Sequence, residues 1–187
     1  MTDVRNRGLV ACHAVILSEL TRIPGYQILW LSDKLMRGAT VTTPFMTTAA
    51  DAGRFTFLGH EFSELATTER TGGSLCVHEI VQHAGGEPPL HVHHREDEAF
   101  YVLEGTMTFH VGAERFVTTA GGFVFCPRDV PHSFTVDSGT ARLLQICAPG
   151  GIDRFFAEWR DRPLDVDAMT AMLAGYGVDV VGPPPGH

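Results

Sequence analysis

Short runs of alternating or continuous apolar residues recur between Arg54 and Ala148. They include GSLCVHEIVQHA, EAFYVLEGTMTFHV and ERFVTTAGGFVFCP, and turns rich in glycine, proline and aspartate separate them. Alternation with a period of two is typical of strands with one buried face. Many short strands at this spacing indicate an antiparallel sandwich or barrel. We therefore predict an all-β domain over residues 55–148.

The pattern changes after Pro149, where apolar residues recur at helical spacing. These residues are Ile152, Phe155, Phe156 and Trp159. They predict a short helix that covers an open end of the barrel. A second short helix is expected over PLDVDAMTAMLAGYG, with Asp165 as its N-cap and Gly175 or Gly177 at its end.

Two flanking segments complete the expected organisation. The final residues, VVGPPPGH, are expected to be extended and poorly ordered. We therefore assign residues 149–187 to a C-terminal helical arm and tail. Residues 1–54, where periodicity does not decide between helix and strand, are assigned to an N-terminal extension of uncertain order.

Composition and charge argue against several classes of partner. The chain of 187 residues has a formal net charge of −8, and its 14 Lys and Arg form no cluster, so we expect no nucleic-acid partner. No apolar run reaches the ~18 residues of a membrane span, and no clear signal peptide begins the chain. Four well-separated cysteines without a CxxC pair are typical of reduced thiols. We expect a cytoplasmic protein with no membrane partner.

Histidines and acids gather in PPLHVHHREDEAFYVLEGTM, residues 88–107. Such a stretch fits a solvated loop, a proton-transfer site or a metal site. If it is a strand, alternation places His91 and His93 on one face and His94 on the other. Two imidazoles on one face form half of a first-row metal site, and a nearby carboxylate would add a ligand. The residues alone leave four candidate acids: Glu96, Asp97, Glu98 and Glu104.

The segment from Gly85 to Gly105 resembles the first conserved motif of the cupin superfamily. That motif consists of Gly, five residues, His-x-His, three or four residues, Glu, six residues and Gly. His91, His93 and Glu98 stand at the remaining fixed positions. The spacing back from Gly105 selects Glu98 among the acids.

A second segment resembles the second cupin motif, in which Gly, five residues, Pro, x, Gly, two residues, His, three residues and Asn follow one another. Gly121, Pro127 and His132 match it. Asp129 stands where the family has Gly, and aspartate tolerates the same turn conformation. Val136 replaces an Asn that does not bind metal in the family.

The resemblance implies a jelly-roll barrel, an antiparallel double-stranded β-helix followed here by short C-terminal helices. It implies one divalent transition metal held by His91, His93, Glu98 and His132. Donor type alone does not choose among Fe, Mn, Ni, Co, Cu and Zn.

The other polar residues of these segments receive no role in the site. We interpret His94, Glu96 and Asp97 as solvated turn residues. Four histidines are interpreted as polar residues on strand faces: His60, His78, His83 and His110. Cys126 is expected to be a small buried residue.

Alternation also predicts the wall of a substrate pocket. In GTMTFHVG, Met107, Phe109 and Val111 are expected to face the barrel interior, and Thr106, Thr108 and His110 the solvent. Phe123 and Phe125 share one face of a later strand, and Phe134 follows His132. We expect five of these residues to line an apolar pocket around the metal: Met107, Phe109, Phe123, Phe125 and Phe134. The alternative is that they form only the barrel core.

The chain resembles small single-domain, quercetinase-like cupins, which implies a metal-dependent dioxygenase. Its substrate would be a small organic molecule of phenolic or polyketide-like type. Glu98 would serve as general base by taking a proton from a bound phenol or enol. The alternatives are a metal-dependent isomerase or cyclase, and a cupin that binds a small molecule without turnover. Because partners often cover exposed strand edges, we also expect a homodimer.

Overall fold

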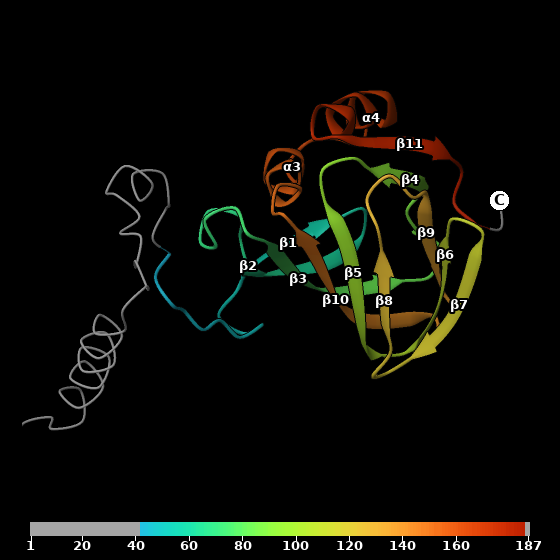
Figure 1. The fold of residues 1–187 in the computed structure, drawn as a ribbon, viewed down its shortest axis with the longest axis horizontal. Coiled ribbons are helices and arrows are strands. Elements are labelled where there is room, and N and C mark those ends of the chain that lie inside the picture. Colours follow the sequence, from blue (N-terminus) through green and yellow to red (C-terminus); the bar gives the residue numbers. More distant parts are fainter. Residues whose placement is uncertain (1–41, 186–187) are drawn as a thin grey trace, which may run out of the picture. The chain divides into compact units, whose positions relative to one another are not determined.

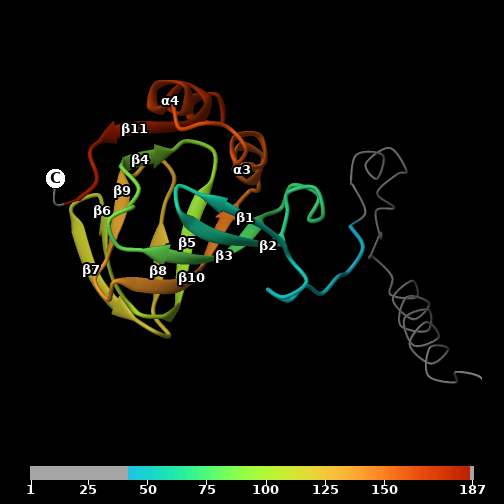
Figure 2. The ribbon, with the colours of Figure 1, turned by 180° about the vertical axis from the view of Figure 1, so that it is seen from behind.

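Two antiparallel sheets enclose the core of residues 42–185, the part of the chain that the computed structural model describes (Figures 1 and 2). The first sheet has the strand order β1-β2-β3-β10-β5-β8, and the second has the order β11-β4-β9-β6-β7. The first six strands are β1 (Gly53–Phe57), β2 (His60–Ala66), β3 (Cys76–His83), β4 (Leu90–His93), β5 (Asp97–Glu104) and β6 (Thr106–Val111). The others are β7 (Glu114–Thr119), β8 (Phe123–Cys126), β9 (His132–Val136), β10 (Thr140–Ala148) and β11 (Val178–Gly182). This arrangement confirms the all-β prediction.

The core lies between the sheets, and β6 shows how alternation builds it. Met107, Phe109 and Val111 are buried as predicted, and the ring of Phe109 contacts those of Phe100 and Phe134. Each such side chain contributes about 1.5–3 kcal/mol when it leaves water. The expected exposure of Thr108 is wrong, because this residue is only 2% exposed. Its hydroxyl donates a hydrogen bond to the Asp137 carboxylate at 2.7 Å, which satisfies it away from water.

The short helix α3 (Asp153–Trp159) closes one end of the first sheet. Its N-cap Ile152 and three apolar residues within it, Phe155, Phe156 and Trp159, are buried as predicted. The ring of Phe156 lies 5.2 Å from those of Phe57 on β1 and Phe62 on β2. Asp153 anchors the start of the helix, since its carboxylate accepts hydrogen bonds from the backbone N–H and the hydroxyl of Thr68. The helix is therefore fastened by both apolar packing and a buried polar contact.

The second helix, α4 (Val166–Gly175), lies beside β11 (Figure 1). Asp165 caps it as predicted, because its carboxylate accepts a hydrogen bond from the Ala168 N–H at 3.0 Å. None of its residues is fully buried. The helix ends before Gly177, whose φ of +83° suits glycine.

The tail that begins at Val180 is extended as predicted, but its first residues, up to Gly182, are ordered in β11. Val178 pairs with His93, and Val180 pairs with His91, so the end of the chain adds a strand to the second sheet. Without β11, the edge of β4 would carry unpaired backbone groups. The need for this partner is not visible in the local sequence, which contains three consecutive prolines just after the strand.

The predicted domain boundaries stay predictions. The first strand begins at Gly53 and β10 ends at Ala148, but β11 returns the later segment to the barrel. Residues 1–41 of the expected N-terminal extension lie outside the described residues. Within residues 42–185, no helix is long and apolar enough to cross a membrane.

A pH-dependent contact ties β11 to the loop before β9. His94 Nδ1 lies 2.7 Å from an Asp129 oxygen, and its Nε2 lies 3.1 Å from an Asp179 oxygen. Hydrogen bonds to these two carboxylates raise the pKa of His94 above its ordinary value. The stabilisation that protonated His94 gives to the fold is therefore fully present below the pKa of about 6.5 that this residue has in the unfolded chain. It is lost as the pH rises through the pKa of His94 in the folded protein.

We expect His94→Gln to lower the unfolding temperature more at about pH 5.5 than at about pH 9. The measurement is thermal unfolding of both proteins at the two pH values, in the presence of a chelator. Asp179→Asn should reduce the same pH-dependent difference. An equal effect of His94→Gln at both pH values would contradict this account.

Candidate metal centre

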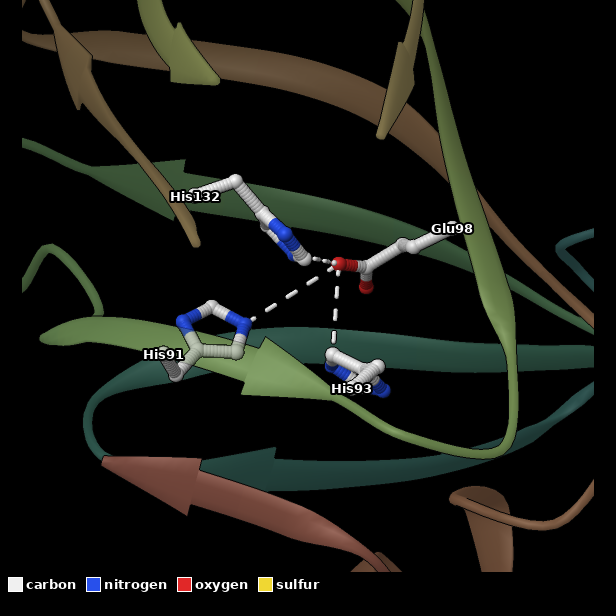
Figure 3. A group of neighbouring side chains, drawn as sticks. All are labelled: His91, His93, Glu98 and His132. Atoms are coloured by element: carbon white, nitrogen blue, oxygen red, sulfur yellow. Dashed lines mark hydrogen bonds and ion pairs between the residues drawn. The ribbon is translucent and has the colours of Figure 1, made fainter. Parts of the chain in front are cut away.

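Four side chains from both sheets meet inside the barrel (Figure 3). His91 and His93 lie on β4, and His132 begins β9, where it pairs with His91. Glu98 comes from β5 of the other sheet. These are the four residues that the sequence motifs select, and β11 and β9 hold the strand of His91 and His93 from its two sides.

The turn before β9 helps to place His132. Asp129 has a φ of +64°, which is the left-handed conformation that glycine serves in the family motif. Its N–H donates a hydrogen bond to the carbonyl of His93 at 2.8 Å. The aspartate at this position is therefore compatible with the turn, and the turn is fastened to the end of β4.

The donor atoms converge on one point. Glu98 Oε2 lies 2.8 Å from Nε2 of His132, 3.8 Å from Nε2 of His93 and 4.0 Å from Nε2 of His91. One ligand atom from each of the four residues lies within 4.8 Å of all the others. Four ligand atoms that each lie about 2.0–2.2 Å from one ion would be separated from one another by distances like those observed between these donor atoms. The spacing therefore fits a single metal ion.

The outer nitrogen of each imidazole faces an acceptor. His91 Nδ1 lies 2.8 Å from the Pro89 carbonyl, and His132 Nδ1 lies 3.0 Å from the Val130 carbonyl. His93 Nδ1 lies 3.5 Å from Oε2 of Glu96. An N–H directed at each acceptor leaves the lone pair of Nε2 free to bind a metal at the centre. The three acceptors thus orient all three imidazoles with Nε2 toward the centre.

The electrostatics of the centre also suit a cation. Burial and the nearby His132 lower the pKa of His91 to about 4. Burial would raise the pKa of Glu98, but His93 and His132 hold it well below its usual range. Burial opposes charge on His132, yet its hydrogen bond to Glu98 raises its pKa above the ordinary value. An ionised carboxylate surrounded by imidazoles is the donor set that a divalent transition metal requires.

Glu96 corrects the sequence interpretation of a solvated turn residue. Its side chain is 1% exposed, and it supports His93 from outside the centre. The neighbouring His94 and Asp97 do lie at the surface, where Asp97 pairs with Arg128. The run of acids does not show that one of them points inward. Glu96 is covered by a segment that follows β10 and includes Gly151, which is distant in the sequence.

His60 and His78 are polar residues on strand faces as predicted, and the face they share is the inner one. Both are buried on the inner face of the first sheet, and the alternating burial of β3 places His78 and Gln82 in phase with the core. His60 Nε2 lies 2.7 Å from the Gly86 carbonyl. The opposite face of β3 carries valines, so hydrophobicity did not reveal which face is inside. In contrast, His83 and His110 are not buried.

A cavity of about 370 Å³ borders the centre. His91, His93 and Glu98 form part of its wall, with polar side chains from Gln82 and Gln145. Its other walls are mainly apolar and include Phe57, Phe62, Ile80, Phe100, Phe134 and Phe155. Several of these come from α3 and the strands that it covers. The centre therefore faces a space suited to an apolar molecule.

Of the five residues predicted for the pocket wall, Phe134 lines this cavity. Met107 and Phe109 are buried in the core and are not among the residues that line the cavity. Phe123 and Phe125 are 60% and 52% exposed, because Val124 and Cys126 occupy the inner face of β8. Alternation showed that the two phenylalanines share a face, but apolar residues on both faces hid which one is inside. Cys126 is buried as expected, and the homodimer stays a prediction.

Gln145 is a residue of the site that the sequence reasoning missed. It lies on β10, and its Nε2 donates a hydrogen bond to Oε1 of Glu98 at 2.6 Å. The available signal was a polar residue in phase with Leu143 and Cys147, both of which are buried. A polar side chain on the apolar face of a strand indicates a partner inside.

Two facing antiparallel sheets with three histidines and a glutamate between them agree with the barrel and the ligand set that the cupin resemblance implies. The family model of the cupin domain matches residues 78–147, a range that contains all four residues of the centre. Residues 78–147 therefore match the cupin domain, and the chain resembles quercetinase-like members of that superfamily.

Individual relatives agree with this assignment. The chain is 27% identical over 117 residues to quercetin 2,3-dioxygenase of Bacillus subtilis. The aligned region covers 61% of this chain and 34% of the relative. The chain thus spans about a third of the length of that curated relative.

Solved structures share the fold at lower identity. An RmlC-like cupin from Shewanella frigidimarina has a TM-score of 0.52 and 22% identity, covering 60% of this chain and 96% of its own. KdgF from a Halomonas species has a TM-score of 0.52 and 18% identity, covering 60% and 99%. These likenesses establish the barrel alone.

We expect Glu96→Gln to weaken divalent metal binding about 10- to 100-fold, because His93 then loses its charged acceptor. The measurement is calorimetric titration of metal-free protein with Co²⁺. Glu104→Gln, which changes an exposed glutamate at the end of β5, should retain the affinity of the unmodified protein. Equal affinity of Glu96→Gln and the unmodified protein would show that Glu96 has no part in the site.

Proposed function

We propose that the protein is a metal-dependent dioxygenase that acts on a small, flat organic substrate of phenolic or polyketide-like type. The observation that carries this proposal is the opening of the three-histidine, one-glutamate centre into an apolar cavity of about 370 Å³. The likeness to a relative named quercetin 2,3-dioxygenase supports the same class of reaction.

The cavity supports binding of a flat apolar body with one polar end. Rings of Phe100 and Phe134 lie 5.5 Å apart in the wall, and aromatic side chains from α3 close another side. These surfaces remove the apolar part of the substrate from water. Its polar oxygen is then directed to the wall formed by His91, His93 and Glu98.

Proton transfer falls to Glu98 in this proposal. The surrounding imidazoles keep its pKa well below the usual range against the effect of burial, so the carboxylate is ionised at neutral pH. An ionised carboxylate at the cavity wall can accept a proton from a phenol or enol. When bound, a redox-active ion would supply electron transfer between O₂ and the substrate. Among the expected metals, Fe, Mn, Ni, Co and Cu suit this role, whereas Zn suits an isomerase or cyclase.

We expect Glu98→Gln to reduce turnover about 100- to 10,000-fold, which is more than it reduces metal content. Oxygen uptake would be followed with quercetin and with smaller phenols, and metal content would be measured on the same samples. Glu104→Gln provides a matched control on the same strand.

The outcomes separate the alternatives. Parallel loss of metal and turnover in Glu98→Gln would reduce Glu98 to a ligand. Metal-loaded protein that converts a phenolic or enolic substrate without consuming oxygen would indicate an isomerase or cyclase. Protein that binds such a molecule without converting it would be a binding cupin.

A further inference from the structure

Gln145 connects the centre to a buried histidine behind it. On β10 it pairs with His78 of β3, so the two side chains lie side by side on the inner face of the sheet. Its Nε2 lies 2.6 Å from Glu98 Oε1, and its Oε1 lies 3.1 Å from His78 Nδ1. A continuous chain of hydrogen bonds therefore runs from His78 through Gln145 to Glu98.

The other nitrogen of His78 has no hydrogen-bond partner. Its Nε2 is the one buried side-chain nitrogen or oxygen without a partner in the described part of the chain. The ring is fully buried, and the rings of Phe55, Phe62 and Phe156 lie 6.3, 5.8 and 5.4 Å from it. An unpaired polar atom in such surroundings is destabilising, so a residue selected only for packing here would be apolar.

The direction of each hydrogen bond follows from Glu98. An ionised carboxylate only accepts hydrogen bonds, so the Gln145 amide must direct Nε2 toward it. The amide oxygen then faces His78, whose Nδ1 must carry the hydrogen. Burial lowers the pKa of His78 and keeps the ring neutral, so Nε2 retains only a lone pair. The unpaired nitrogen is thus a consequence of the hydrogen bond that His78 gives to Gln145.

The two oxygens of Glu98 have different neighbours. Oε2 lies within 4.0 Å of Nε2 of all three histidines of the centre. Oε1 faces away from them, toward Gln145 and the thiol of Cys147 at 3.8 Å. The Gln145 amide is the nearer of these two donors, and together they occupy Oε1 and leave Oε2 for the metal.

We propose that Gln145 and His78 are positioning residues of the centre. Gln145 holds Oε1 of Glu98 so that Oε2 points at the three imidazoles, and His78 prevents the amide of Gln145 from rotating. The inference rests on the metal centre of the proposed function, but it does not depend on the reaction that the centre catalyses.

The first test is the affinity of metal-free protein for Co²⁺, with the visible spectrum of the bound ion as a report on its ligands. Gln145→Leu should weaken binding about 10- to 100-fold and alter the spectrum. Thr108→Val removes a different buried polar side chain, on β6, which contacts Asp137 instead of Glu98. It should leave both the affinity and the spectrum unchanged. Unchanged Co²⁺ binding by Gln145→Leu would overturn the proposal.

The second test separates positioning from packing at His78. The side-chain amide of asparagine can replace the Nδ1–H donor, whereas leucine fits the aromatic surroundings but donates nothing. We expect His78→Leu to unfold at the higher temperature of the two variants, yet to bind Co²⁺ more weakly than His78→Asn. In the Gln145→Leu background, His78→Leu should cause no further loss of affinity. A Co²⁺ affinity that follows the unfolding temperature would reduce His78 to a packing residue.

The third test needs no metal. Nitrogen NMR of the histidine rings should show His78 with its hydrogen on Nδ1 in the unmodified protein, and this preference should weaken in Gln145→Leu. A hydrogen on Nε2 in the unmodified protein would overturn the proposal. Altered Co²⁺ binding with no oxygen uptake for any phenol would defeat the proposed function while leaving this inference intact.

Discussion

The charge of Glu98, buried between two sheets of apolar side chains, is the constraint on which the rest of the site depends. Removing an unpaired carboxylate from water costs several kcal/mol, so the fold must compensate it. Three imidazoles surround one of its oxygens, and the amide of Gln145 donates to the other. A divalent ion bound by the imidazoles would complete this compensation, which is why the arrangement fits a metal site better than a proton-transfer site alone.

The barrel supplies the rigidity that such a cluster needs. The strand of His91 and His93 is paired on one side with the strand that begins at His132, and on the other with β11. The buried contacts of Asp153 with Thr68 fasten α3 over the aromatic side of the cavity. Acceptors at the outer nitrogen of each imidazole fix the rings in turn. The positions and protonation of the four ligands are therefore set by residues that would not themselves coordinate a metal ion.

Local patterns in the sequence were enough to predict the strands of the β domain and both helices, whereas the four residues of the centre came from the resemblance to the cupin motifs. Alternation identified the β domain, and motif spacing selected Glu98 and His132. The same alternation did not say which face of a strand is inside when both faces are apolar, so it did not show that Phe123 and Phe125 are exposed. The inward turn of Glu96 depends on chain some fifty residues later. Such long-range contacts leave no local pattern.

The central claim is that the four converging side chains hold a metal, and elemental analysis tests it most directly. Purified protein and the double variant His91→Ala/His132→Ala would be analysed side by side after equal loading. The account predicts roughly one transition-metal ion per chain in the unmodified protein, and its loss in the variant. Absence of metal from the unmodified protein under every loading condition, or equal content in the variant, would contradict it.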